Sequence, residues 1–150
     1  MINKDIIRLA SNTSNVGLKK WYSHKISLKN STCGDKITLE LIADKKKISS
    51  MKYETISCVY CEASASLLSG KIKNVKLKDI KNDLKNLKKI SLKKNAKIPK
   101  RFSDFEKLLN SDNFNRFKCI FLPIDAVLKA LKLWKKYSLF YLCSVFFQKL

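Results

Sequence analysis

The residues best suited to chemistry in this sequence are a thiol and a carboxylate two positions apart. Cys33 and Asp35 flank Gly34 in the segment 30–35, which reads NSTCGD. Because glycine adopts positive φ without a Cβ clash, the turn can aim both side chains at one point. A soft thiolate beside a hard oxygen donor suits a metal that is held but can still leave. The pair alone is a weak signal, so its weight depends on further ligands downstream.

Two further cysteines, Cys58 and Cys119, could complete such a site. With Cys33 and Asp35 they would supply three thiolates and one carboxylate, a tetrahedral set that suits zinc or the edge of an iron–sulfur cluster. The alternative is three unrelated buried cysteines, since a free cysteine often serves as a small core residue. Spacing alone leaves these two interpretations evenly balanced.

The composition is that of a globular protein. The chain has 150 residues, which suits one domain over 1–150, and 45% of them are hydrophobic, which argues against disorder. Polar residues from Asn3 to Arg8 interrupt any apolar core of a signal peptide, so we expect a cytoplasmic protein with reduced cysteines. Five cysteines, an odd number, also fit poorly with a closed disulfide framework.

The formal net charge of +20 raises the question of a nucleic-acid partner. Of the 32 basic residues, however, only Arg8, Arg101 and Arg116 are arginine, the side chain that favours bidentate recognition of bases and phosphates. We therefore expect no specific nucleic-acid binding and interpret the lysines as a solvated basic surface.

Hydrophobic patterning predicts an α+β fold in which helices pack on a three-stranded antiparallel sheet. A short helix over 2–10 precedes a loop over 12–17. Alternating apolar residues then predict three strands, over 21–28, 36–43 and 48–56. Because their connections are short, these strands should form an antiparallel meander.

Helical patterns follow the strands. Small residues predict a helix from Cys61 that ends near Gly70, and an apolar stripe predicts an amphipathic helix over 76–90. We expect Ser103 to cap a short helix that runs to Leu109, because a glutamate three residues later completes a capping box.

Helical spacing returns over 115–136, but Pro123 interrupts it. We expect a kink or break there, which would leave the carbonyl of Cys119 free. The last residues, 137–150, form an atypical apolar tail whose uncharged stretch over 139–147 is too short to span a bilayer, which needs about 20 residues. The tail should pack either on the core or on a second subunit. In the second case the protein would form a homodimer.

Three segments together resemble one known family. Segment 30–35 resembles the NPxCGD loop of the iron–sulfur assembly scaffolds IscU, SufU and the N-terminal domain of NifU. Segment 57–68, SCVYCEASASLL, is similar to their GCxxxxASAS motif, and segment 116–119, RFKC, to their third cysteine site. The resemblance covers about residues 5–131. It implies the family's α+β fold, with a helix, three strands and then helices.

Within the family, the chain most resembles the SufU-type branch. IscU-type members place a histidine before the third cysteine, where this chain has Lys118, whereas SufU-type members have Arg-x-Lys-Cys. The 60 residues between Cys58 and Cys119 also resemble the longer SufU spacing. The one histidine, His24, falls on the apolar face of the first predicted strand, so we expect a core or sheet residue there rather than a ligand.

The resemblance implies a ligand set of Cys33, Asp35, Cys58 and Cys119, with Lys118 as a nearby cation that lowers the thiolate pKa.

Three departures accompany this set. Ser31 replaces the usual proline, and Ser57 replaces the glycine before the second cysteine. Cys61 is an additional thiol, either a spare ligand or sulfur acceptor or, as we favour, a small residue on a buried helix face.

The implied function is that of a scaffold or sulfur acceptor in iron–sulfur cluster assembly. Such a protein binds iron or a [2Fe-2S] cluster, or zinc, and takes persulfide sulfur from a cysteine desulfurase before passing its cargo to apo acceptor proteins. Cys33, Cys58 and Cys119 are the candidate sulfur acceptors. An accessory protein of this kind is not a self-contained enzyme. The alternative function is a basic, zinc-stabilised module that binds nucleic acid.

Overall fold

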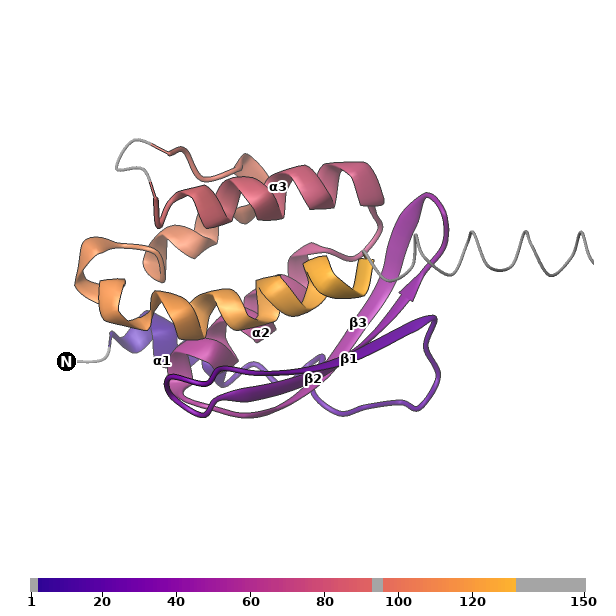
Figure 1. Cartoon of the computed structure of the whole chain (residues 1–150), viewed down its shortest axis with the longest axis horizontal. Helices are drawn as coiled ribbons and strands as arrows, with labels where there is room; N and C mark the ends of the chain where they lie inside the picture. The colour runs from indigo at the N-terminus through magenta and orange to yellow at the C-terminus, as the bar shows by residue number, and fades with distance from the viewer. Residues whose placement is uncertain (1–2, 93–95, 132–150) are drawn as a thin grey trace, which may run out of the picture.

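A computed structural model describes residues 3–92 and 96–131, which form an antiparallel sheet of four strands in the order β1-β2-β3-β4 with helices on one face (Figure 1). The strands are β1 (His24–Lys29), β2 (Lys36–Ala43), β3 (Lys47–Ile56) and β4 (Val75–Lys76). The predicted meander is confirmed. The fourth strand was not predicted, because two residues are too few to show an alternating pattern.

The register of the sheet gathers the predicted ligands at one end. Lys29 at the end of β1 pairs with Lys36 at the start of β2, and Lys36 pairs with Ile56 at the end of β3. The segment 30–35 joins the first two of these residues, and Cys58 follows the third by two positions. Antiparallel pairing therefore places Cys33, Asp35 and Cys58 at the same edge of the fold.

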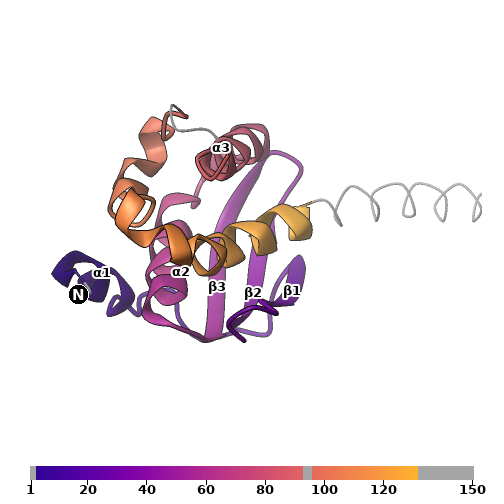
Figure 2. The same ribbon diagram turned by 60° about the vertical axis from the view of Figure 1, so that its left-hand side comes forward.

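The apolar face of the sheet is covered by helices (Figure 2). Ile37, Leu39 and Leu41 of β2 have no exposed surface, which confirms the alternation that predicted this strand. The helices are α1 (Lys4–Ala10), α2 (Val59–Lys71), α3 (Leu77–Lys89) and the helix of residues 117–131. Two 3₁₀ segments, η1 (Lys100–Lys107) and η2 (Ser111–Arg116), connect the last two helices.

The helices α2 and α3 differ in the surfaces they present. In α2, eight of the 13 residues are buried, and the small side chains allow it to pack between the sheet and other helices. In α3, the buried residues form the predicted stripe of Leu77, Ile80, Leu84 and Leu87, and the lysines lie outside it. The interpretation of these lysines as a solvated face is confirmed.

The predicted end of a helix near Gly70 is confirmed to within one residue, since α2 ends at Lys71. The helix predicted to start at Ser103 is wrong. The segment around Ser103 is the 3₁₀ helix η1, which begins after Pro99 without a side-chain cap. Proline fixes its own φ and favours the start of the helical turn that follows.

A kink or break was expected at Pro123, but residues 117–131 form one continuous helix, so the helix does not break there. Proline still lacks the N–H that the carbonyl of Cys119 would accept. In the same turn, the hydroxyl of Ser64 in α2 donates to the carbonyl of Ile120 at 2.6 Å. This buried hydrogen bond stabilises the helix where its own backbone bonding is weakened.

The first strand begins at His24, three residues later than predicted. The aromatic side chains of Trp21 and Tyr22 are exposed, because a loop over 16–23 leads into β1 instead of a strand. No helix within 3–92 and 96–131 is long and apolar enough to cross a membrane. The tail at 137–150 lies outside the described residues, so its predicted packing and the homodimer stay predictions.

Candidate metal centre

A tight turn presents the first two predicted ligands. The side-chain oxygen of Asn30 accepts from the N–H of Thr32 at 3.0 Å, and its carbonyl accepts from the N–H of Gly34 at 2.8 Å. Asn30 also donates its own N–H to the carbonyl of Asp35 at 2.7 Å. Gly34 has a φ of +78°, as predicted, which ordinary side chains rarely adopt. Asn30 and Gly34 thus shape the turn that carries Cys33 and Asp35.

Three of the four predicted ligands meet at the end of the sheet, and the fourth, Cys58, is bonded to one of them. The sulfur atoms of Cys33 and Cys119 lie 3.4 Å apart, and with a carboxylate oxygen of Asp35 they lie within 4.8 Å of one another. The thiol of Cys58 donates to Oδ2 of Asp35 at 3.2 Å, and its backbone N–H donates to Oδ1 at 3.0 Å. Residues separated by 86 positions in sequence are therefore brought together around one carboxylate.

The spacing suits a single metal ion or one edge of a cluster. Two sulfur atoms bound to one zinc ion at about 2.3 Å stand about 3.8 Å apart in a tetrahedron. The observed separation between Cys33 and Cys119 is slightly shorter than this. Three sulfurs and one carboxylate oxygen are also a donor set that zinc or an iron–sulfur cluster accepts, so the residues present fit such a group.

Exposure decreases across the cluster. Cys33 is exposed and Cys58 is half-buried, whereas Cys119 and Asp35 retain only 3% and 5% of their surface. The site is therefore open to solvent on the side of the turn and closed on the side of the helix. Cys33 is the sulfur that another protein could contact first.

The metal-free site holds protons that a metal would have to displace. Burial of Asp35 raises the pKa, but hydrogen bonds from the thiol and N–H of Cys58 outweigh it, so the pKa of Asp35 is lowered overall. Burial strongly raises the pKa of Cys119, and hydrogen bonds to Cys33 and Asp35 add to the effect. Cys119 is thus a protonated thiol, and metal binding there must release a proton.

Two serines of the ASAS segment hold the frame around the site. Ser64 links α2 to the helix that carries Cys119 through the carbonyl of Ile120, as described above. Ser66 donates to the carbonyl of Asn12 at 3.2 Å and so ties α2 to the loop after α1. The sequence motif included this segment, but it predicted no role for the two hydroxyl groups. The alanines that alternate with these serines, which allow close packing, were the signal available in the sequence.

Glu62 is a further residue that sequence reasoning missed. Its carboxylate accepts a hydrogen bond from the hydroxyl of Tyr53 at 3.3 Å and another from the hydroxyl of Thr55. These bonds fix the first turn of α2 against β3, directly after Cys58. The sequence pattern did not predict this contact. Tyr53 and Thr55 lie in β3 and Glu62 in α2, and local periodicity does not show which strand residues a helix will contact.

The other singled-out residues are not members of the ligand set. Cys61 is fully buried in α2, and burial raises its pKa to about 12, which supports the interpretation as a core residue. His24 lies at the opposite end of β1, where its Nδ1 contacts the hydroxyl of Ser23 at 2.8 Å. The ammonium group of Lys118 contacts the hydroxyl of Thr32 at 3.4 Å. Its expected effect on thiolate pKa stays a prediction.

Comparison with known proteins identifies relatives of this fold and sequence. The sequence model of the NifU-like N terminal domain matches residues 1–137. The iron–sulfur cluster assembly scaffold protein IscU of Thermotoga maritima is 33% identical over 111 residues, which cover 69% of this chain and 73% of that protein.

Solved structures agree on the fold. A NifU-like protein (N-terminal) from Brucella abortus has a TM-score of 0.79 at 21% identity, covering 89% of this chain and 94% of that one. A structure named as an iron–sulfur cluster assembly scaffold protein for the SUF system, from Fervidobacterium islandicum AW-1, has a TM-score of 0.74 at 23% identity, with coverages of 87% and 96%. The predicted fold class and family are thereby confirmed: this chain belongs to the NifU-like N-terminal domain family.

Proposed function

We propose that this protein is a scaffold for iron–sulfur cluster assembly. The convergence of Cys33, Asp35 and Cys119, with Cys58 bonded to the same carboxylate, carries the proposal. Membership of the NifU-like family and the resemblance to a named IscU scaffold support it. As a scaffold, the protein acts as an accessory to other proteins and not as a self-contained enzyme, and the cytoplasm stays its predicted location.

Iron or a [2Fe-2S] cluster is the cargo that this site would hold, and zinc is the alternative occupant. Cys33, Cys58 and Cys119 would bind through sulfur and Asp35 through oxygen. Thiolates bind zinc and iron strongly, whereas a hard carboxylate is the weaker partner of a soft metal. Asp35 is therefore the ligand that yields its place when the cargo passes to an apo acceptor protein.

Sulfur would arrive from a cysteine desulfurase as a persulfide. The thiolate of Cys33 attacks the outer sulfur of the donor's persulfide, the sulfur–sulfur bond of the donor breaks, and the donor cysteine leaves as a thiolate. Cys33 then carries the persulfide, with no net change in electrons at this step. The exposure of Cys33 supports this assignment, because the nearly buried Cys119 is not accessible to a second protein.

The decisive experiment measures metal and acid-labile sulfide in protein purified without oxygen. We expect iron with sulfide, or zinc, bound at one site per chain. Incubation with a cysteine desulfurase, L-cysteine, ferrous iron and a reductant should then build a chromophore that Cys33→Ser cannot build. Cys61→Ser, which changes a buried thiol outside the ligand set, is the matched control. Equal cluster formation in both variants would refute the role given to Cys33. No chromophore in the unmodified protein would refute the scaffold proposal, and copurified nucleic acid with zinc alone would favour the basic binding module.

A further inference from the structure

The sulfur atoms of Cys33 and Cys119 are close enough to form a disulfide after a small movement. They lie 3.4 Å apart, whereas the sulfurs of a disulfide stand about 2.05 Å apart. Both cysteines are free thiols, one on the turn before β2 and the other on the helix of residues 117–131. Closure of the bond therefore requires the turn and the helix to approach by little more than about 1 Å.

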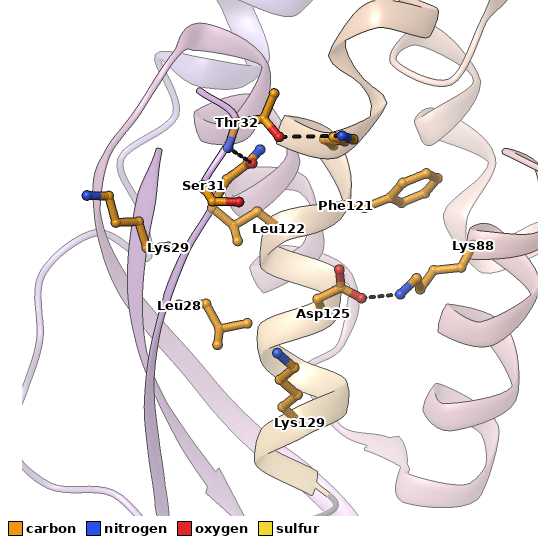
Figure 3. Close-up of a pocket in the computed structure, with 11 residues that line it drawn as sticks. Leu28, Lys29, Ser31, Thr32, Lys88, Phe121, Leu122, Asp125 and Lys129 are labelled. Atoms are coloured by element: carbon orange, nitrogen blue, oxygen red, sulfur yellow. Dashed lines mark hydrogen bonds and ion pairs between the residues drawn. The ribbon is translucent and has the colours of Figure 1, made fainter. Parts of the chain in front are cut away.

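The residues that precede the two cysteines are also in contact. The ammonium group of Lys118 contacts the hydroxyl of Thr32 at 3.4 Å, so the turn and the helix lie side by side next to the sulfur pair (Figure 3). Beyond this contact the two segments are separated by a cavity of about 440 Å³, lined by Asn30 on one side and by Phe121 and Leu122 on the other. In the part of the chain that the structure describes, no side chain fills this space. The turn therefore has room to move toward the helix.

Exposure determines which of the two sulfurs an oxidant reaches first. Cys33 is exposed, whereas Cys119 retains only 3% of its surface. A peroxide in solution therefore meets the sulfur of Cys33. An exposed cysteine with a second thiol beside it is the arrangement in which a sulfenic acid is converted to a disulfide.

Cys58 is the competing partner for Cys33, but it already bonds to Asp35. The thiol of Cys58 donates to Oδ2 of Asp35 at 3.2 Å, and its backbone N–H donates to Oδ1 at 3.0 Å. Cys58 also does not belong to the group of ligand atoms that lie within 4.8 Å of one another, whereas Cys33 and Cys119 do. The geometry therefore favours one pairing among the three cysteines.

From these observations we propose that a peroxide converts Cys33 and Cys119 of the metal-free protein into a reversible disulfide that closes the site. The thiolate of Cys33 attacks hydrogen peroxide, the oxygen–oxygen bond breaks, and hydroxide leaves, so that Cys33 becomes a sulfenic acid. The sulfur of Cys119 then bonds to the sulfur of Cys33. The sulfur–oxygen bond breaks, and the hydroxyl group leaves with the thiol proton of Cys119 as water. The two cysteines together lose two electrons, and the peroxide gains them.

The disulfide would remove two metal ligands and the candidate sulfur acceptor in one step. Metal binding requires thiolates, which the oxidised pair no longer offers. A metal bound by both sulfurs would in turn protect them from oxidation. Loading of the site then depends on reducing conditions, and a dithiol reopens it. This consequence rests on the proposed function, whereas the formation of the disulfide does not.

The test oxidises the full chain, freed of metal and reduced, with one equivalent of hydrogen peroxide. Remaining thiols are alkylated, and tryptic peptides are analysed by mass spectrometry without reduction. Because trypsin cuts after lysine, Cys33, Cys58 and Cys119 fall in the separate peptides 30–36, 53–71 and 119–129. We expect peptide 30–36 to be linked to 119–129, at a rate independent of protein concentration. Zinc affinity of the oxidised protein should fall on the order of 100-fold and return after treatment with dithiothreitol.

Cys58→Ser and Cys119→Ser are a matched pair of variants, because each removes one thiol of the ligand set. Cys58→Ser should still form the disulfide. Cys119→Ser should stop at a sulfenic acid on Cys33, which dimedone labels. Cys61→Ser, which changes a fully buried thiol, should form the disulfide as the unmodified protein does.

Four outcomes would overturn the inference. They are the absence of a linked peptide, a link between peptides 30–36 and 53–71, a link between two copies of the chain whose rate rises with concentration, and unchanged zinc affinity after oxidation. The assembly assay described above tests the proposed function separately. A protein that builds the chromophore but never links Cys33 to Cys119 refutes only this inference. A protein that forms the link but builds no chromophore when reduced refutes only the scaffold function.

Discussion

Asp35 and Glu40 are two buried carboxylates, one directly before β2 and one in its middle, and they have different hydrogen-bond partners. Oε2 of Glu40 accepts from the backbone N–H groups of Lys19 and Lys20 at 2.8 and 3.1 Å, and Oε1 pairs with the ammonium of Lys25 at 3.3 Å. Asp35 instead accepts from the thiol and N–H of Cys58, with the two other sulfurs close by.

The difference concerns what can displace each set of partners. Amide N–H groups and an ammonium group are permanent donors, so Glu40 fixes the loop over 16–23 against the outer face of the sheet. Its bonds also hold Lys20 at a φ of 60°, a left-handed conformation that is costly for a residue other than glycine. Thiol protons leave when a metal binds, so the surroundings of Asp35 are suited to exchange. The comparison separates a carboxylate that holds the fold from one that serves a site.

The largest effect should come from the cysteines around Asp35. Serine at Cys33, Cys58 or Cys119 should weaken metal binding on the order of 100-fold or more, because the thiolate is the ligand that zinc or iron requires. Competition with a chromophoric chelator measures this affinity. Cys61→Ser and Cys143→Ser should keep the metal, although Cys143 lies outside the described residues. Full metal retention in all three ligand variants would show that these cysteines do not form the metal site.

The next largest effect should be a difference in stability between the alanine variants of the two carboxylates. Glu40→Ala should lower the free energy of unfolding of the metal-free protein by about 2–3 kcal/mol, since it leaves two loop N–H groups without their acceptor. Asp35→Ala should cost less, about 1 kcal/mol, because it leaves only one backbone N–H, that of the half-buried Cys58, without its acceptor. Urea denaturation with a chelator and a reductant present measures both.

Glu54→Ala is the matched control for this contrast. Glu54 is exposed on β3, and its one contact with the loop, from the N–H of Leu18, is long at 3.4 Å. Its removal should change stability by less than about 0.5 kcal/mol. If Asp35→Ala and Glu40→Ala cost the same, the proposed division of roles between the two carboxylates is wrong.

A smaller effect should appear in the kinetics of the loaded protein. Asp35→Ala should retain its occupant through three thiolates, but transfer to a chelator or apo acceptor should slow on the order of tenfold, because no weak oxygen ligand remains to yield. Stopped-flow absorbance follows the transfer. Asp44→Ala, which removes an exposed carboxylate at the far end of the sheet, should leave the rate unchanged. Release as fast as from the unmodified protein would contradict the role given to Asp35.

The smallest effect concerns the frame that positions Cys119. Ser64→Ala should lower the free energy of unfolding by about 1 kcal/mol, the usual net contribution of one hydrogen bond, and should change metal affinity much less than a ligand substitution does. Ser103→Ala, at an exposed position, is the control. A loss of metal binding without a loss of stability would assign Ser64 to the site itself.

Much of the fold could be predicted because its signals are local. The alternation in β2 and the stripe of α3 are properties of short windows, and both strand and helix formed where their periods indicated. The candidate ligands were found through their motifs, and the structure brings them together. The errors at Ser103 and Pro123 have another origin. Packing and tertiary hydrogen bonds outweighed residue propensities that favour helix ends.

The role of Glu40 illustrates what sequence reasoning could not reach. In the alternating pattern of β2 it falls on the face opposite Leu39 and Leu41, where a charged residue is expected to meet solvent. It is buried only because a loop over 16–23 crosses that face. The path of a loop cannot be predicted from hydrophobic periodicity, because loops have none. The cavity beside Asn30 is similar, since it forms between segments that are nearly 90 residues apart.

The order of the strands also affects the tendency of this protein to aggregate through its sheet edges. In the part of the chain that the structure describes, β1 is an edge strand that carries Lys25 and Lys29. At the opposite edge, the two-residue β4 pairs with the start of β3, and the loop over 15–17 bonds to β3 at Tyr53. Unpaired strand edges are templates for aggregation, and lysines or very short strands protect them. Salt screens this protection, because the Debye length falls from about 10 Å at 0.1 M to about 3 Å at 1 M. High ionic strength should therefore promote edge-to-edge association through β1, so the abundant lysines also help to keep the protein in solution.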